Sequence, residues 1–285
     1  MADPRIHHLN CASMHPVAGF SLEHRGGAFT GLVCHCLLIE TTHGLTLVDT
    51  GLGTTDVRAG AQRLGRMFWH VVRPALDPRE TAKYQIEALG FSVADVRHIV
   101  LTHLDVDHAG GIGDFPNARV HVLAAEHAAA QARRHLKERD RYRPAQWPAR
   151  TEWALYAPEG ERWHGFEAVQ ALTGLDPDIL LVPTAGHTRG HAAIAVRQGA
   201  GWLLHAGDAY FHRDQMARHA GCPLGLRLFE AAMALDNGQR RTNQARLREL
   251  ALDDDTVRVF CSHDPVELAQ ATPPSEIAPA PASNC

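Results

Sequence analysis

Apolar residues alternate along the chain between short runs and longer periodic segments. Eight short apolar runs predict strands over residues 32–40, 45–48, 99–101, 119–123, 179–182, 192–197, 202–205 and 256–261. Four segments with helical periodicity predict helices over residues 54–72, 79–89, 124–139 and 242–250. Blocks of strands with helices between them favour a layered α/β sandwich over a doubly wound sheet.

The least regular stretch is 140–167, which holds Trp147, Trp153 and Trp163, three of the five tryptophans. We interpret residues 124–167 as a Trp-rich helical and loop insertion. The pattern leaves open whether its tryptophan segment 147–163 is a lid over a pocket, an oligomer surface or a simply packed connection.

The length of 285 residues and the apolar share of 45% fit one domain with a sizeable core, over residues 1–270. The Pro- and Ala-rich tail 271–285 is expected to be disordered. A net charge of −4 without a long basic run argues against nucleic acid or a membrane surface as partner. No apolar run reaches the roughly 18 residues that a bilayer span requires, and the start of the chain lacks an apolar signal segment. We therefore expect a cytoplasmic protein.

The six cysteines are scattered and do not predict a disulfide framework. Cys34 and Cys36 flank His35 and could form a metal-binding pair. They lie inside the predicted strand 32–40, however, which favours two small apolar side chains on one buried face.

Potential metal ligands cluster directly after the predicted strand 99–101. His103, Asp105, Asp107 and His108 fall within six residues, before Gly110-Gly111. Imidazole and carboxylate groups at a strand end are suited to a divalent cation such as zinc. Taken alone, this segment could also be an ordinary polar turn.

The same chemistry recurs at other predicted strand ends. Asp49 follows strand 45–48, and three later strands are followed by His187, Asp208 and His263 in turns bounded by Gly or Pro. Independent surface turns are not expected to repeat this pattern. The sequence therefore predicts a metal site assembled from strand ends.

These motifs resemble, in order and approximate spacing, those of the metallo-β-lactamase superfamily. The resemblance covers roughly residues 30–265 and implies a four-layer αββα sandwich with a site at one edge, between two sheets. It also assigns roles by position, as follows. His103, Asp105 and His187 would hold one metal ion, Asp107, His108 and His263 would hold a second, Asp208 would bridge both, and Asp49 would lie behind the ligands.

Asp105 departs from the family pattern, which usually has a histidine at that position. A carboxylate makes the donor set harder and more anionic, so iron or manganese become alternatives to the zinc that the family leads us to expect first. The flavodiiron branch of the superfamily has a glutamate there and binds two irons, so the substitution is compatible with two divalent ions.

The resemblance implies a dinuclear metal-dependent hydrolase, in which a hydroxide bridging the metal ions attacks the substrate. Asp107 is the candidate proton acceptor. Tyr210 is the candidate oxyanion donor, because N-acyl-homoserine lactone lactonases use a tyrosine close after the bridging aspartate, though one residue further on. An aromatic residue that merely packs near the site is an equally good interpretation of Tyr210.

Details of the motif at 186–191 and of the approach segment 77–101 resemble the lactonase-like branch. The leading hypothesis is hydrolysis of a lactone or carboxylic ester, with an apolar acyl chain under the Trp-rich segment. Phosphotriester, phosphodiester or glyoxalase II-like thioester hydrolysis are alternatives, and a di-iron redox protein is an alternative from another class. The expected partner is a small-molecule substrate, and a homodimer is left open.

Overall fold

The computed structural model describes residues 4–17, 31–157, 159–175 and 178–272, whose strands form two sheets of six. The first sheet has the order β1 (Ile6–Met14), β2 (Leu32–Thr41), β3 (Gly44–Val48), β4 (Val96–Val100), β5 (Arg119–Leu123) and β6 (Glu152–Tyr156). The second has the order β12 (Val257–Phe260), β11 (Gly201–His205), β10 (Ala192–Gln198), β9 (Ile179–Pro183), β8 (Phe166–Ala171) and β7 (Glu161–Trp163).

The α-helices are α1 (Thr54–Ala59), α2 (Ala61–Leu64), α3 (Ala82–Ala88), α4 (Val106–Ala109), α5 (Ala124–Ala132), α6 (Leu136–Arg141), α7 (Leu224–Met233), α8 (Asn237–Asp253) and α9 (Pro265–Ala271). A π-helical turn spans Phe68–Val72, and 3₁₀ turns span Pro78–Glu80, Val93–Asp95, Gly110–Asp114, Pro144–Gln146 and Arg213–Met216. None of the helices among the described residues is long and apolar enough to cross a bilayer.

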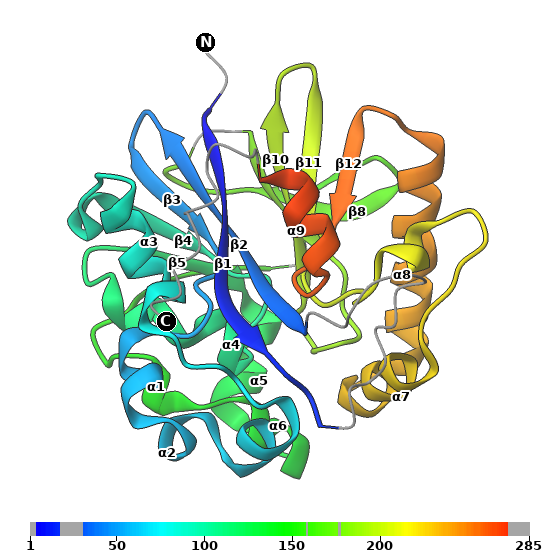
Figure 1. The fold of residues 1–285 in the computed structure, drawn as a ribbon. Helices are drawn as coiled ribbons and strands as arrows, with labels where there is room; N and C mark the ends of the chain where they lie inside the picture. Colours follow the sequence, from blue (N-terminus) through cyan, green and yellow to red (C-terminus); the bar gives the residue numbers. More distant parts are fainter. Residues whose placement is uncertain (1–3, 18–30, 158, 176–177, 273–285) are drawn as a thin grey trace, which may run out of the picture.

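Three apolar clusters separate four layers, and Figure 1 shows α1 to α3 and α8 on opposite sides of the sheets. One cluster packs β-strand residues such as Leu47 against Ile86 of α3. The middle cluster lies between the sheets and includes Val100 and Ile194. The third includes Leu247 of α8. The predicted αββα sandwich is confirmed.

Strand direction brings the motif-bearing strand ends to one edge. β3 and β4 are parallel, as are β11 and β12, and β9 runs in the same direction as β11 because β10 is antiparallel to both. At this edge the backbone N–H of Ala192 donates to the carbonyl of Thr102 at 2.9 Å, which joins the two sheets. The loops after these five strands therefore meet.

The segment 124–167 differs from its prediction. The single helix expected over 124–139 is divided at Arg133, which has a left-handed backbone with φ 40°, so that α5 and α6 are separate. The expected irregular stretch also contains β6, which pairs with β5, and β7, which joins the second sheet. Strand pairing of this kind depends on distant partners, which local composition does not reveal. The predicted tail falls mostly on residues 273–285, outside the described residues.

Candidate metal centre

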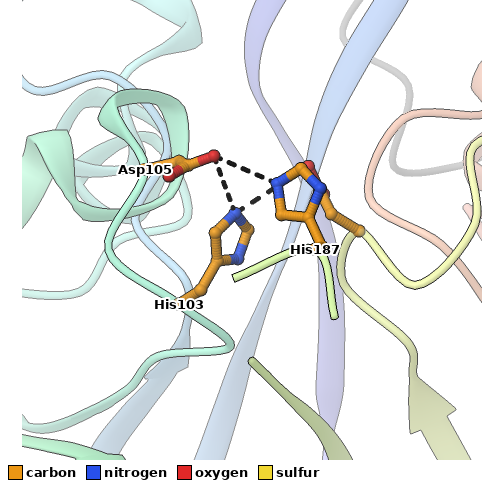
Figure 2. A group of neighbouring side chains, drawn as sticks. His103, Asp105 and His187 are labelled. Atoms are coloured by element: carbon orange, nitrogen blue, oxygen red, sulfur yellow. Dashed lines mark hydrogen bonds and ion pairs between the residues drawn. The ribbon is translucent and has the colours of Figure 1, made fainter. Parts of the chain in front are cut away.

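The first group of donors, here called the first subsite, consists of His103, Asp105 and His187. Asp105 Oδ2 lies 3.4 Å from His103 Nε2 and 3.0 Å from His187 Nε2, so three donor atoms from two loops converge on one point (Figure 2). All three side chains are buried. His103 follows β4, Asp105 precedes the first residue of α4, and His187 follows β9.

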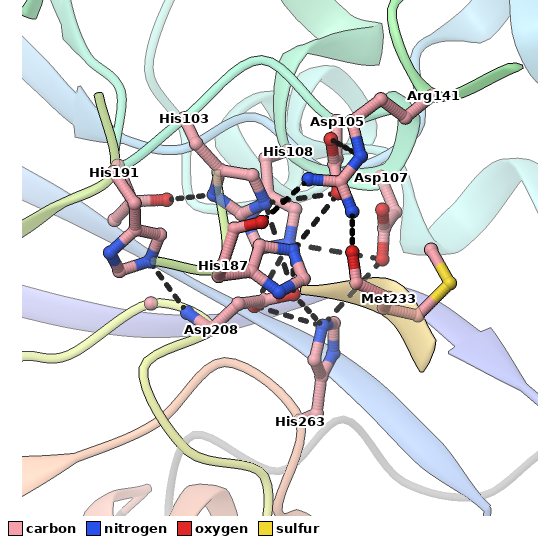
Figure 3. A network of polar contacts seen from close by, with 12 residues as sticks. His103, Asp105, Asp107, His108, Arg141, His187, His191, Asp208, Met233 and His263 are labelled. Carbon is pink, nitrogen blue, oxygen red and sulfur yellow. Dashed lines mark hydrogen bonds and ion pairs between the residues drawn. The ribbon is translucent and has the colours of Figure 1, made fainter. Parts of the chain in front are cut away.

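The second subsite consists of Asp107, His108 and His263, and Asp208 lies between the two subsites. Asp208 Oδ2 is 3.3 Å from His187 Nε2, whereas Asp208 Oδ1 is 3.2 Å from His108 Nε2 (Figure 3). His263 Nε2 lies 3.1 Å from Asp208 Oδ1 and 3.7 Å from Asp107 Oδ2. Asp208 Oδ2 also lies 3.2 Å from His263 Nε2. One carboxylate thus contacts histidines of both subsites, which is the arrangement that a bridging ligand requires.

Buried acceptors behind the histidines fix which ring nitrogen points into the centre. The backbone N–H and the hydroxyl of Thr102 both donate to Asp49 at 2.8 Å, and His108 Nδ1 lies 2.8 Å from Asp49 Oδ2. His103 Nδ1 lies 2.9 Å from the Thr102 hydroxyl oxygen. Both histidines therefore direct Nε2 toward the other donors. Asp49 lies behind the ligand positions, where the resemblance places it.

Hydrogen bonds to ring nitrogens also hold the loops that carry His263 and Asp208. His263 Nδ1 lies 2.7 Å from the carbonyl oxygen of Val33, an acceptor that leaves Nε2 free for the centre. His191 Nε2 accepts the backbone N–H of Asp208 at 2.9 Å, while His191 Nδ1 lies 3.0 Å from the Thr184 hydroxyl. His191 therefore supports the bridging loop.

Two buried residues that hold the metal-binding loops in place belong to none of the sequence motifs. Glu126 is fully buried in α5 and accepts the backbone N–H of Leu104 and that of Gly190, each at 3.0 Å, so it links the loops of His103 and His187. Arg141 is buried at the end of α6, with Nε 3.4 Å from Asp105 Oδ1. A charged residue in an Ala- and Arg-rich segment predicts a solvated helix face, so no sequence pattern pointed to Glu126 or Arg141.

The acids and histidines of the centre shift each other's pKa values. Burial opposes ionisation of Asp208, but the charges of His263 and His108 outweigh it and hold the pKa of Asp208 well below its usual range. Burial likewise opposes protonation of His108, yet Asp208 and Asp107 raise the pKa of His108 well above its usual range. The carboxylates of Asp208 and Asp107 therefore favour positive charge beside them.

Unsatisfied atoms show that these residues fit metal ions. His103 Nε2, His108 Nε2 and Asp208 Oδ1 are buried without a hydrogen bond among the described residues. Buried polar atoms are normally paired, and exceptions call for a specific explanation such as an ion. Three groups of donors lie close enough together to share an ion: His103 with Asp105, His187 and Asp208; His108 with Asp208 and His263; and Cys34 with Asp107 and His263.

Cys34 and Tyr210 lie differently from what the sequence suggested. Cys34 is buried in β2, as expected, but its Sγ is 3.8 Å from Asp107 Oδ2, so it is more than a small apolar side chain. The Tyr210 side chain is fully buried, and its hydroxyl donates to Glu267 at 2.9 Å. That hydroxyl is engaged outside the donor cluster, which does not support Tyr210 as the oxyanion donor.

A cavity of about 490 Å³, including space open to solvent, adjoins the donors. Most of its other walls are apolar, formed by Met14, Leu32, Met67, Phe68, Val72, Phe211, Phe229 and Met233. An outer groove continues from it past Leu136 and Leu228. No tryptophan lines either space among the described residues: Trp147 packs edge-on against Trp153, with ring centroids 6.3 Å apart. The apolar wall therefore comes from β1, β2, the π-helical turn and the residue before it, the loop after β11, and α7.

Comparison with known proteins agrees with this geometry. The family model of the metallo-beta-lactamase superfamily matches residues 29–263. A probable metallo-hydrolase of Mycobacterium tuberculosis is 45% identical over 271 residues, which cover 94% of this chain and 83% of the relative. An N-acyl homoserine lactonase of a Bacillus species is 25% identical over 240 residues, 84% of each chain.

A solved structure of an N-acyl homoserine lactone hydrolase, with N-hexanoyl-L-homoserine at its catalytic metal centre, shares the fold. Its TM-score is 0.71 at 21% identity, and the match covers 96% of this chain and 98% of that one. The chain therefore belongs to the metallo-beta-lactamase superfamily, as a metal-dependent hydrolase.

Proposed function

We propose that the protein hydrolyses a lactone or related carboxylic ester with a dinuclear metal centre, and that zinc occupies both subsites. The observation that carries the proposal is the position of Asp208, whose carboxylate contacts His187 of the first subsite and His108 of the second. Histidine and carboxylate donors suit zinc, and the additional carboxylate Asp105 keeps iron or manganese as alternatives.

The bound ions would polarise the ester carbonyl and lower the pKa of a water molecule between them. The residues of the chain have three tasks around that chemistry. Asp208 keeps the two subsites at a fixed separation. Asp107 lines the cavity and is the candidate proton acceptor, through Oδ1, because Oδ2 is turned toward His108 and His263. The apolar walls exclude competing water.

The shape and polarity of the cavity favour an ester with an apolar part. Met67, Phe229 and Met233 line both the cavity beside the donors and the outer groove, so an apolar chain could extend from the ester toward solvent. Relatives named as N-acyl homoserine lactonases act on lactones that carry an acyl group, which is the same combination. The acyl chain would lie under α7 instead of under the tryptophans.

A substrate panel tests this proposal. Protein loaded separately with zinc, manganese or iron is assayed with lactones of increasing acyl length, aryl esters, thioesters and phosphotriesters. We expect lactones to have the highest kcat/KM, and kcat/KM to rise with acyl length. If phosphotriesters or thioesters are turned over better than every lactone, the substrate assignment is wrong. If no ester is hydrolysed with any of the metals, the hydrolase proposal fails.

A further inference from the structure

The first subsite contains a carboxylate at the position where the resemblance leads us to expect a histidine, and a buried arginine lies against that carboxylate. Only 4% of Arg141 and 5% of Asp105 are exposed. Arg141 Nε faces Asp105 Oδ1 at 3.4 Å, whereas the other oxygen, Oδ2, faces His187 and His103 (Figure 3). The two oxygens of Asp105 therefore have different neighbours.

The guanidinium cannot turn away from Asp105, because its other nitrogens are engaged. Nη1 donates to the backbone carbonyl of His187 at 3.0 Å, and Nη2 donates to that of Met233 at 2.7 Å. These two bonds hold the planar guanidinium in place, so that its three nitrogens point toward Asp105, the His187 loop and the end of α7. A lysine has one nitrogen and cannot reproduce this geometry.

Charge explains why such a residue is needed. Exchanging a neutral imidazole for a carboxylate adds one negative charge to a buried donor set that already contains Asp208. A buried charge is costly unless it is paired, and a second carboxylate oxygen is free to compete for the metal ion. One fixed arginine addresses both effects, since it supplies a positive charge and its Nε lies 3.4 Å from Oδ1 as an ion pair without a hydrogen bond.

We propose that Arg141 is a positioning residue that adapts the first subsite to Asp105: it offsets the added negative charge and keeps Oδ1 away from the metal, so that Oδ2 is the single ligand oxygen. This inference rests on the metal centre of the proposed function but not on the substrate. The proposal assigns a role in metal binding to α6. This helix lies in the segment that the sequence analysis interprets as an insertion.

A double-mutant cycle tests the coupling between the two residues. Wild-type protein, Arg141→Met, Asp105→His and the double variant are loaded with zinc, and bound zinc is measured against increasing concentrations of a chelator. In the wild-type background, Arg141→Met should weaken zinc binding at one subsite by about 10- to 100-fold. In the Asp105→His background, the same change should cost less than about 3-fold, because no second carboxylate is left to offset.

A purely structural role for Arg141 gives a different result. The two bonds to backbone carbonyls are lost in either background, so an equal loss of zinc affinity in both would overturn the proposal. Unchanged zinc binding by Arg141→Met would overturn it as well. Should Arg141→Met fail to fold, Arg141→Lys retains the charge, and its smaller loss must still depend on residue 105.

Glu138→Gln is the matched control. Glu138 lies on the same helix and pairs at 2.7 Å with Arg189 of the His187 loop, and the described residues show no hydrogen bond or ion pair between Glu138 and Asp105. We expect its zinc affinity to stay within about 3-fold of wild type in both backgrounds. Because zinc retention is measured without substrate, failure of ester hydrolysis and failure of the Arg141 proposal are distinguishable.

Discussion

Asp49 Oδ2 accepts a hydrogen bond from His108 Nδ1 at 2.8 Å, and this bond directs His108 Nε2 toward the bridging carboxylate. The same Asp49 carboxylate accepts two hydrogen bonds from Thr102, next to His103. One buried acid therefore orients a ligand of each subsite. Its backbone adopts φ 55°, an uncommon conformation for a non-glycine residue, at the turn after β3.

Replacing Asp49 should weaken metal binding without removing a ligand. Asp49→Asn retains the size of the side chain but exchanges one acceptor oxygen for a donor, so His108 and Thr102 cannot both be satisfied. We expect metal affinity to fall about 10- to 100-fold, measured by competition with a chelator. Asp56→Asn, at a buried acid bound to Arg63, is the control and should change affinity little. Equal affinities for Asp49→Asn and wild type would show that orientation of His108 does not depend on Asp49.

Glu126 should be important for stability. Glu126→Ala leaves the backbone N–H groups of Leu104 and Gly190 buried without an acceptor, at about 1–3 kcal/mol each. The free energy of unfolding of the metal-free protein, from urea denaturation, should therefore drop by roughly 2–6 kcal/mol. Glu126→Gln keeps one acceptor and should lose roughly half as much. A loss below about 0.5 kcal/mol for the alanine variant would contradict the proposed link between the loops.

Tyr210→Phe separates the two interpretations of this tyrosine. Its hydroxyl donates to Glu267 and does not line the cavity, so kcat with the best ester should stay within about 3-fold of wild type. Loss of a direct oxyanion donor typically lowers kcat about 10²- to 10³-fold. A loss in that range, with the metal content unchanged, would restore Tyr210 as a catalytic residue.

Glu267 should give the folded protein a distinctive pH dependence. Burial raises the pKa of Glu267 to about 7, although the backbone N–H of Cys261 donates to it. The folded carboxyl thus keeps its proton up to about pH 7, whereas the unfolded chain loses it near pH 4.3. The stabilising contribution is complete below the unfolded pKa and is lost as the pH rises through the folded one.

Glu267→Gln cannot lose this proton. The stability of the variant relative to wild type should therefore rise between pH 5 and pH 8, by up to about 3 kcal/mol. Urea denaturation of both proteins at the two pH values measures the difference. A difference that is independent of pH would mean that Glu267 is ionised in the folded protein throughout this range.

The metal-binding donors could be predicted from the sequence because their positions depend on short local motifs. Each donor lies in the segment that follows an apolar strand, as His103 follows β4 and Asp208 follows β11, so a short motif and a strand prediction place it. The strand directions then bring the ends together. The layered fold follows from the same alternation of strands and helices.

The residues that hold the metal-binding donors in place could not be predicted from the sequence, because they act through contacts between distant parts of the chain. Glu126 reaches Gly190, and Arg141 reaches Asp105 and Met233, from helices whose composition suggests exposure. Likewise, β6 forms because β5 offers it a parallel edge, although the sequence around Trp153 looked irregular. The burial of Tyr210 is also decided by packing, here against the second sheet.

The central claim is that Asp208 joins two metal subsites, and the metal content of Asp208→Ala tests it most directly. Wild-type and variant proteins are metal-depleted, reloaded with zinc, passed through a desalting column and measured by elemental analysis. We expect two zinc ions per chain for wild type and one or none for Asp208→Ala, with loss of esterase activity. Two retained zinc ions in the variant, or a single ion in wild type, would contradict the dinuclear centre.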